Sequence, residues 1–386
     1  MKMNIDMAEV TRLTRLGKLT EAMAVLRGHG GPKVGAGNMT MTAEIEMRQT
    51  ADGAWSDASD AASPPQPDRA PPPVKPRIDL KDLVGKFRAP LQAGAHGRNR
   101  PPMPPGAHFS EHTFGQGYTA RRYKLYVPSR RAGGQPALVV MLHGCTQSPD
   151  DFAIGTGMND LAERNGFLVL YPEQSAAANM NRCWNWFNDT DQRRDHGEPA
   201  LLVGMIRHII GVHAIDPQKV FVAGLSAGGA MAAILGARYP EVFSGVGVHS
   251  GLAVGAAHDM TSAFGAMSQG GSQSGVLAGV GRVPTIVFHG DRDGTVNSRN
   301  GDQVVAQVVN GRALTRTTTS GQAVSGRGYD QTLYSDPNGT TVVEHWVIHG
   351  VGHAWSGGHP EGSYTDARGP SASEEMVRFF LQDRGL

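Results

Sequence analysis

From about residue 118 onward, the pattern of apolar and polar positions alternates between two periods. Short runs rich in β-branched and aromatic residues predict buried strands at 121–128, 137–142, 167–171, 219–223, 245–249, 285–288 and 341–348. Apolar residues at helical spacing predict helices at 151–165, 199–212, 227–239 and 371–384. For the last helix, Ser371 and Glu374 form a capping-box signature. Such alternation predicts an α/β fold, a mainly parallel sheet with helices on both faces.

The region before residue 106 has a different pattern. Residues 1–28 predict an amphipathic N-terminal helix that docks on the domain or makes an oligomer contact, rather than lying on a membrane surface. Twelve of the 24 prolines fall between Pro64 and Pro105, so 29–105 is interpreted as a flexible or partly polyproline II linker. We therefore expect residues 106–386 to form the catalytic domain.

Composition narrows the possible functions. A chain of 386 residues can bury a large core, and its net charge of +1 favours neither nucleic acid nor a membrane surface as partner. No apolar run reaches the length of a membrane span. These features are typical of a globular enzyme.

A G-x-S-x-G motif connects one predicted strand to the next helix. Ser226 lies between Gly224 and Gly228, after the run 219–223 and before 230–243. This context indicates a nucleophile elbow, in which a sharp turn exposes the serine hydroxyl and the glycines let strand and helix converge. The alternative is a simple turn, so the assignment depends on finding partners for the serine.

A serine nucleophile needs an imidazole base and a carboxylate that orients it. The strand at 285–288 runs into His289-Gly290-Asp291-Arg292-Asp293, and we choose Asp293 as the acid, with Asp291 as a turn residue. The strand at 341–348 is followed by His353 on a glycine-flanked loop. We choose His353 as the base over His349, which belongs to the end of the strand.

Two further features concern the oxyanion and metals. The backbone N–H of Ala227 and that of Cys145, with Thr146 as second choice, are the expected donors to an oxyanion. His345, His349 and His353 recur every four residues, but on a strand and loop this spacing does not build a metal face. We therefore predict no metal site.

Several motifs together resemble the poly(3-hydroxybutyrate) depolymerase family of esterases, within the α/β-hydrolases and alongside feruloyl and acetylxylan esterases. They are residues 143–147 (HGCTQ), 171–174 (YPEQ), 183–187 (CWNWF), 224–231 (GLSAGGAM) and 352–355 (GHAW). The resemblance covers about residues 106–386. It implies an α/β-hydrolase fold and serine esterase activity without a metal or organic cofactor.

The resemblance also suggests a disulfide between Cys145 and Cys183, where the alternative is two buried thiols. A disulfide and the family favour an extracellular or periplasmic location. Residues 1–10 lack the apolar core of a signal peptide, which by default indicates the cytoplasm. The two indications conflict.

Substrate choice is expected to depend on the walls of the site. Trp184, Trp186 and Trp355 could form an apolar pocket or could pack against the sheet, and 252–283 could be a flap or a surface insertion. Depolymerases that resemble this chain carry a separate binding domain after the catalytic one, and no such segment follows here, which favours short esters. We expect cleavage of short hydroxyalkanoate esters, with feruloyl or acetylxylan esterase as the alternative and a non-catalytic binding protein as a remote one.

Overall fold

The computed structural model describes residues 103–117, 120–131, 133–271 and 283–382, and the backbone of two short strands before them. The chain divides into two units, Met1–Arg77 and Ile78–Leu386. In the first unit, β1 (Met47–Gln49) pairs antiparallel with β2 (Trp55–Asp57), within the stretch interpreted as linker. The sequence pattern did not indicate this pair. The helix and oligomer contact predicted at 1–28 lie outside the described residues.

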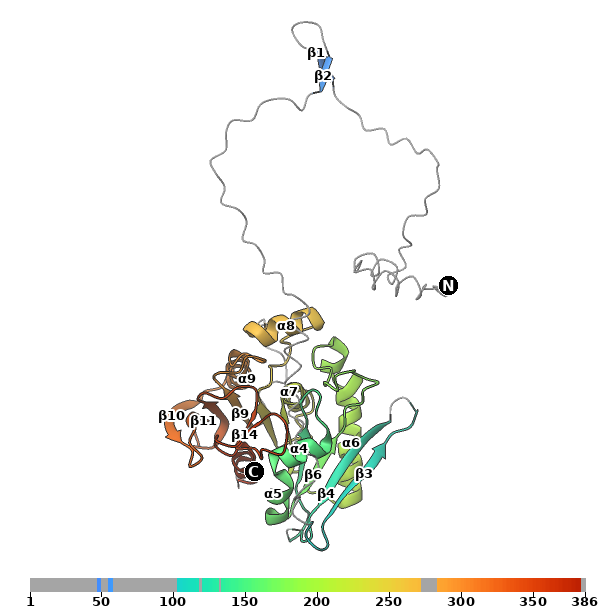
Figure 1. Ribbon diagram of the computed structural model, residues 1–386, viewed down its shortest axis with the longest axis vertical. Helices are drawn as coiled ribbons and strands as arrows, with labels where there is room; N and C mark the ends of the chain where they lie inside the picture. Colours follow the sequence, from blue (N-terminus) through green and yellow to red (C-terminus); the bar gives the residue numbers. More distant parts are fainter. Residues whose placement is uncertain are drawn as a thin grey trace. The chain divides into compact units, whose positions relative to one another are not determined.

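The second unit is built on a ten-stranded sheet (Figure 1). Its order is β10-β11-β12-β9-β8-β7-β5-β6-β4-β3, and the six strands from β12 to β6 run parallel, while two strands at each edge are antiparallel. The strands are β3 (His108–Phe114), β4 (Arg121–Val127), β5 (Leu138–Leu142), β6 (Leu168–Pro172), β7 (Val220–Leu225), β8 (Gly245–His249), β9 (Thr285–Gly290), β10 (Thr315–Gln322), β11 (Gly328–Ser335) and β12 (Thr341–Ile348). A separate small parallel pair joins β13 (Trp355–Ser356) to β14 (Thr365–Asp366).

Helices cover both faces of this sheet, and a hydrophobic core lies on each. One core receives side chains of α6 (Gly197–His213), α7 (Ala227–Arg238) and α9 (Arg299–Val309). The other receives side chains of α4 (Pro149–Thr156), α5 (Met158–Asn165) and α10 (Ala372–Leu381). The remaining described helices are the 3-10 helix η2 (Asp189–Gln192) and α8 (Met260–Gln269). The predicted α/β-hydrolase architecture is confirmed.

Strand β5 shows why the sequences of the central strands are unbroken apolar runs. All five of its residues are buried. Leu138, Val140 and Leu142 enter one core, while Val139 and Met141 enter the other. Because successive side chains point to opposite faces, a strand covered on both faces must be apolar at every position.

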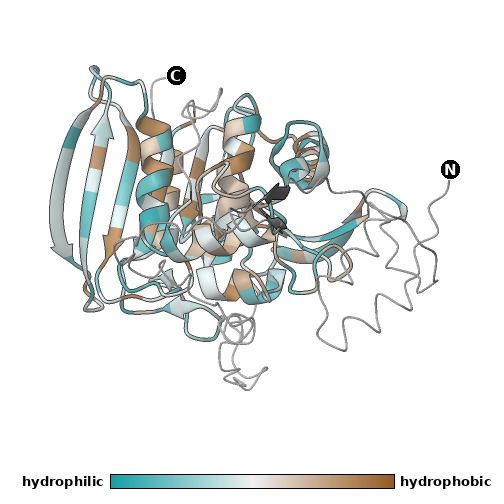
Figure 2. Cartoon of the chain, turned by 90° about the horizontal axis from the view of Figure 1, so that it is seen from above, coloured by the Kyte–Doolittle hydropathy of each residue, from teal (hydrophilic) through white to brown (hydrophobic). Residues whose placement is uncertain are grey.

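Sequence patterns were less informative at the edges and at one helix. The helix predicted at 151–165 is two helices, because Gly157 adopts a left-handed φ of 62° that ends α4 and starts α5. Strands β3, β10 and β11 were not predicted. Strand β10 is exposed along almost its whole length, so it carries no apolar alternation, and the outer strands at that edge are largely teal and white in Figure 2.

The strand order determines where a site can form. From β5 the chain crosses to β6 on one side and then returns to β7 on the other side. Loops after β5 and β7 therefore leave in opposite directions, opening a crevice at the carboxyl ends of these strands. In the described part of the chain, no helix is long and apolar enough to span a membrane.

Candidate active site

Ser226 occupies a strained turn at this crevice. It lies between β7 and α7 with φ 58° and ψ −120°, a backbone conformation that a side-chain-bearing residue rarely adopts. Its N–H donates to the carbonyl of His249 at 2.9 Å, and its own carbonyl accepts from the N–H of Ala230 at 2.9 Å. The surrounding backbone thus imposes the turn, as expected of a nucleophile elbow.

The two motif glycines permit the close approach of strand and helix. A Cβ at Gly224 would lie 2.3 Å from the carbonyl carbon of Gly228. A Cβ at Gly228 would lie 2.0 Å from the carbonyl oxygen of Leu142, at the end of β5. Neither contact is possible for real atoms, so only glycine fits at these two positions.

Asp293 and His353 form a close pair. The Nδ1 atom of His353 lies 2.7 Å from Oδ2 of Asp293, and the aspartate side chain is completely buried. Oδ1 of Asp293 accepts the N–H groups of Thr295 and Val296 at 2.9 and 2.8 Å. Because a carboxylate only accepts, Nδ1 of His353 carries the hydrogen and Nε2 is left as a base.

A second imidazole supports the carboxylate. Nε2 of His289 lies 3.5 Å from Oδ2 of Asp293 and donates to the carbonyl of Val296 at 2.9 Å. Burial by itself raises the pKa of Asp293, but hydrogen bonds and charge from His289 and His353 outweigh burial and lower that pKa well below its usual range. Asp293 is therefore an anion whenever the protein is folded near neutral pH.

Asp291 and His349, the alternatives to Asp293 and His353, pair with each other at the surface. Nδ1 of His349 lies 3.2 Å from Oδ2 of Asp291, and Oδ1 of Asp291 accepts the N–H of Gly350 at 2.7 Å. Both side chains are more than a third exposed. Asp291 thus binds the turn after β12, not its own turn, and neither residue lines the pocket at Ser226.

Two amides of the loop after β5 that could bind an oxyanion are already hydrogen-bonded. The N–H of Gly144 donates to Oε1 of Gln147 at 2.9 Å, and that of Thr146 donates to the carbonyl of Asn181 at 2.7 Å. Within the described residues, the N–H groups of Cys145 and Ala227 have no hydrogen-bond partner. This excludes the second choice, Thr146, as an available donor and leaves the two first choices.

Long-range contacts hold that loop. Cys145 and Cys183 form a disulfide across a separation of 38 residues. Nε1 of Trp184 donates to the carbonyl of His143 at 3.1 Å, and Nε2 of His143 accepts the N–H of Gln174 at 3.1 Å. Burial lowers the pKa of His143 to about 4, so this imidazole is neutral and structural.

Ser226 and His353 line one pocket. The other lining residues are Gly144, Cys145, Leu225, Thr295 and Tyr364. Thr295 lies two residues after Asp293 in the run that begins at His289, so the sequence could have indicated it as a pocket residue. Tyr364 belongs to no motif: it precedes β14, and only the folded chain brings it to His353, with ring centroids 6.3 Å apart.

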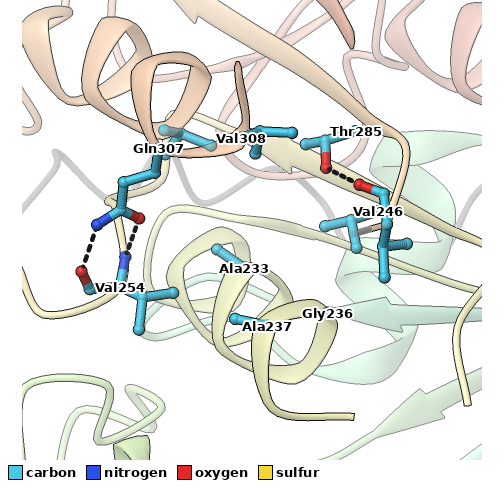
Figure 3. Close-up of a pocket in the computed structure, with 10 residues that line it drawn as sticks. Ala233, Gly236, Ala237, Val246, Val254, Thr285, Gln307 and Val308 are labelled. Carbon is cyan, nitrogen blue, oxygen red and sulfur yellow. Dashed lines mark hydrogen bonds between the residues drawn. The ribbon is translucent and has the colours of Figure 1, made fainter. Parts of the chain in front are cut away.

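A second cavity lies among α7, β8, β9 and α9 (Figure 3). Its walls are mainly Ala and Val side chains, and the amide of Gln307 bridges the backbone of Val254 at 3.0 and 2.7 Å. None of its lining residues is an acid or an imidazole. This cavity therefore lacks the imidazole and the serine hydroxyl that line the pocket at Ser226.

The structure corrects the predicted role of the three tryptophans. Trp184, Trp186 and Trp355 are only 1, 5 and 1% exposed and belong to the hydrophobic cores, and none lines the pocket. Trp355 is fixed by a hydrogen bond from Nε1 to Oγ of Ser373 at 3.0 Å. The structure therefore supports the alternative, in which these tryptophans pack in the hydrophobic cores rather than bind substrate.

The 252–283 segment is part core and part surface. Residues 252–254 are buried, which does not suit a flap. Helix α8 follows, and the side chain of Asp259 caps it by accepting the N–H of Ser262 at 2.7 Å. Residues 272–282 lie outside the described part of the chain. Among the residues described, no cluster of His, Cys, Asp and Glu could hold a metal ion.

Comparison with known proteins agrees with this geometry. The family model described as "Esterase PHB depolymerase" matches residues 121–331, which is more than half of the chain. The chain belongs to this family of esterases. It is 36% identical over 239 residues to poly(3-hydroxyalkanoate) depolymerase C of Paucimonas lemoignei, covering 59% of this chain and 57% of the relative. The match thus spans about half the length of that depolymerase.

Two other relatives have different printed activities. Feruloyl esterase B of Thermothelomyces thermophilus is 30% identical over 259 residues, covering 62% of this chain and 86% of that protein. Among solved structures, an acetyl xylan esterase from Aspergillus awamori matches with a TM-score of 0.54 at 23% identity, covering 70% of this chain and 100% of the other. This structural match supports the fold.

Proposed function

We propose that this chain is a serine esterase that hydrolyses short carboxylic esters through an acyl-enzyme, with hydroxyalkanoate esters as first candidates. The observation that carries the proposal is the contact of 2.7 Å between Asp293 and His353, because His353 lines the same pocket as the strained Ser226. Family membership supports the same chemistry.

In this proposal, Nε2 of His353 takes the proton of Ser226 as its hydroxyl attacks the ester carbonyl. Asp293 holds the imidazole in the tautomer that this step needs and stabilises the imidazolium that forms. The imidazolium then protonates the departing alcohol, and water hydrolyses the acyl-enzyme by the same route in reverse.

The N–H groups of Cys145 and Ala227 are proposed to bind the oxyanion. Both are free of other partners within the described residues, and both belong to residues beside Ser226 in space or sequence. Each donor of this kind contributes about 3 kcal/mol to the transition state.

The test is Ser226→Ala, which should lower kcat on p-nitrophenyl acetate and butyrate by about 10⁴ to 10⁶. Ser244→Ala is the matched control, because this exposed hydroxyl only bonds the carbonyl of Gln218. A fluorophosphonate should label the wild type and the control but not Ser226→Ala. Wild-type activity in Ser226→Ala would refute the assignment, and absence of labelling would favour a non-catalytic binding protein.

Feruloyl or acetylxylan ester hydrolysis is the second candidate. It is favoured by the feruloyl esterase relative, of which this chain covers a larger share than it does of the depolymerase. A kinetic panel should separate the two: acyl esters of increasing length, hydroxybutyrate oligomers, acetylated xylan oligomers and methyl ferulate. The substrate with the highest kcat/KM decides between them.

A further inference from the structure

Two side-chain-bearing residues that line the pocket, Ser226 and Tyr364, have a positive φ, of 58° and 53°. Thr146, next to the lining residue Cys145, is a third, with φ 66°. A positive φ is uncommon for β-branched and bulky residues, and such strain persists only where surrounding contacts enforce it. Oγ1 of Thr146 and the hydroxyl of Tyr364 lie 3.2 Å apart.

The position of Tyr364 is enforced from several sides. Its carbonyl accepts the N–H of Trp355 at 2.7 Å. The preceding residue, Ser363, donates its N–H to Asp151 at 2.9 Å, and its carbonyl accepts from Gln147 at 3.1 Å. Gln147 also holds the loop after β5, so the same contacts align Tyr364 with the proposed oxyanion donors.

The direction of the hydrogen bond between Thr146 and Tyr364 follows from counting hydrogens. The Thr146 hydroxyl has one hydrogen and donates it to the carbonyl of Cys145 at 2.6 Å. In its contact with Tyr364, Thr146 can therefore only accept, and Tyr364 must donate. The phenol oxygen has then used its hydrogen and retains acceptor capacity at the pocket.

An acceptor on a residue that lines the pocket together with Ser226 and His353 can pair with a donor of the substrate. The ring of Tyr364 stands edge-on to His353, which in the proposed mechanism protonates the leaving alcohol. An ester with a hydroxyl near the scissile bond can donate to the phenol oxygen, whereas a plain alkyl ester leaves that oxygen to water.

We propose that Tyr364 is a specificity-determining residue that selects esters carrying a free hydroxyl close to the scissile bond. This inference rests on the proposed esterase function and deepens it. The hydroxyl can belong to the acyl part, as in a 3-hydroxyacyl ester, or to the alcohol part, as in a polyol ester. Both offer the same donor, and the experiment separates them.

The test compares kcat/KM within matched pairs. p-Nitrophenyl 3-hydroxybutyrate against p-nitrophenyl butyrate probes the acyl side, and glyceryl monobutyrate against propyl butyrate probes the alcohol side. Wild-type enzyme should prefer the hydroxylated ester in one pair, and Tyr364→Phe should lower that preference about 2- to 10-fold, the range of one hydrogen bond. Tyr334→Phe, on strand β11 far from the pocket in the sheet order, is the matched control and should leave the preference as it is.

A second variant tests the direction of the bond. Thr146→Val keeps the β-branched shape but frees the hydrogen of the Tyr364 phenol. The kcat/KM for p-nitrophenyl 3-methoxybutyrate, whose ether oxygen can only accept a hydrogen bond, should therefore be higher in this variant than in the wild type. If wild type and Tyr364→Phe show the same preference for the hydroxylated ester in both pairs, the inference about Tyr364 is wrong. The proposed esterase function would not be affected by that result. Failure of the esterase function itself is distinct, since no ester is then cleaved and Ser226 is not labelled.

Discussion

The two walls of the pocket are held in place by different means. The elbow wall, residues 224–228, is positioned by backbone packed on backbone, with glycine where any side chain would collide. The loop wall, residues 143–147, is positioned by side chains: the disulfide to Cys183 and the indole of Trp184 come from a distant part of the chain, and the amide of Gln147 from the loop itself. The first arrangement depends on a short local motif and its packing on the end of β5, and the second depends mainly on side chains from a distant part of the chain.

A buried carboxyl lies behind the loop wall. Oε1 and Oε2 of Glu198 accept Nδ2 and the N–H of Asn185 at 2.7 and 2.8 Å, and Oε1 also accepts Nε2 of Gln174. Gln174 in turn donates to the carbonyl of Cys183 at 2.9 Å. Glu198 is thus connected through the amide of Gln174 to Cys183, the disulfide partner of Cys145.

Because the two walls are held by different contacts, we expect substitutions in them to have different effects. A change in the elbow wall should disrupt the strand and helix themselves, because no alternative backbone arrangement accommodates a side chain there. A change in the loop wall should remove a restraint and leave the sheet intact. Three predictions address this difference.

The largest effect is expected for Gly228→Ala in the elbow wall. Its Cβ would lie 2.0 Å from the carbonyl oxygen of Leu142, so strand and helix must separate. We expect a loss of more than about 4 kcal/mol in the free energy of unfolding, and loss of esterase activity. Denaturant unfolding measures the first, and p-nitrophenyl butyrate hydrolysis the second.

The matched control is Gly211→Ala in α6, where an added Cβ meets no atom within 4 Å. Alanine should stabilise this exposed helical position by about 0.5 to 1 kcal/mol. If Gly228→Ala unfolded no more easily than this control, the backbone account of the elbow wall would be wrong.

A smaller effect is expected when the loop wall loses its disulfide. In the double variant Cys145→Ser, Cys183→Ser, the chain-entropy model for a loop of this length gives a loss of about 3 to 4 kcal/mol in the free energy of unfolding. The sheet should remain intact by far-ultraviolet circular dichroism, with kcat reduced more than KM is raised. A change in the circular dichroism spectrum of the folded variant would contradict a merely restraining role.

The smallest effect should come from Glu198→Gln and should depend on pH. Burial raises the pKa of Glu198 to about 7, while its hydrogen bonds to Asn185 and Gln174 lower it and the nearby Asp191 raises it. The folded state therefore binds a proton that the unfolded state releases above about pH 4.5, so this contribution to stability is present at low pH and declines as pH rises through about 7.

From about pH 5 to pH 8, wild-type protein should lose up to about 3 kcal/mol of stability through Glu198, and Glu198→Gln should lose none through this site. The measurement is the difference in free energy of unfolding between wild type and variant across that range, which cancels the titration of other groups. A difference independent of pH would show that Glu198 is already charged when the protein is folded at low pH.

Much of the fold followed from sequence because central strands buried on both faces are unbroken apolar runs. Strands β8 and β12 have the predicted bounds, and the last predicted helix is present as α10, with Met376, Phe379 and Phe380 buried. Strands β3 and β10 were not predicted because they are largely exposed, and β11 was not predicted because it is only half-buried, so none of the three is an unbroken apolar run. The break between α4 and α5 at Gly157 was not predicted, because the helical pattern of apolar residues continues through this position.

The sequence alone indicated the elbow at Ser226, the positions of Asp293 and His353 after two strands, and the loop that follows β5, since each depends on a turn or strand end encoded in a few adjacent residues. Tertiary structure alone decided that Asp293 meets His353 while Asp291 meets His349, that the three tryptophans are buried, and that Tyr364 joins the pocket. These outcomes depend on contacts between residues far apart in the chain. The free energy of these contacts depends on the order of the strands in the sheet and on the packing of helices against it. A local pattern of residues contains no information on either.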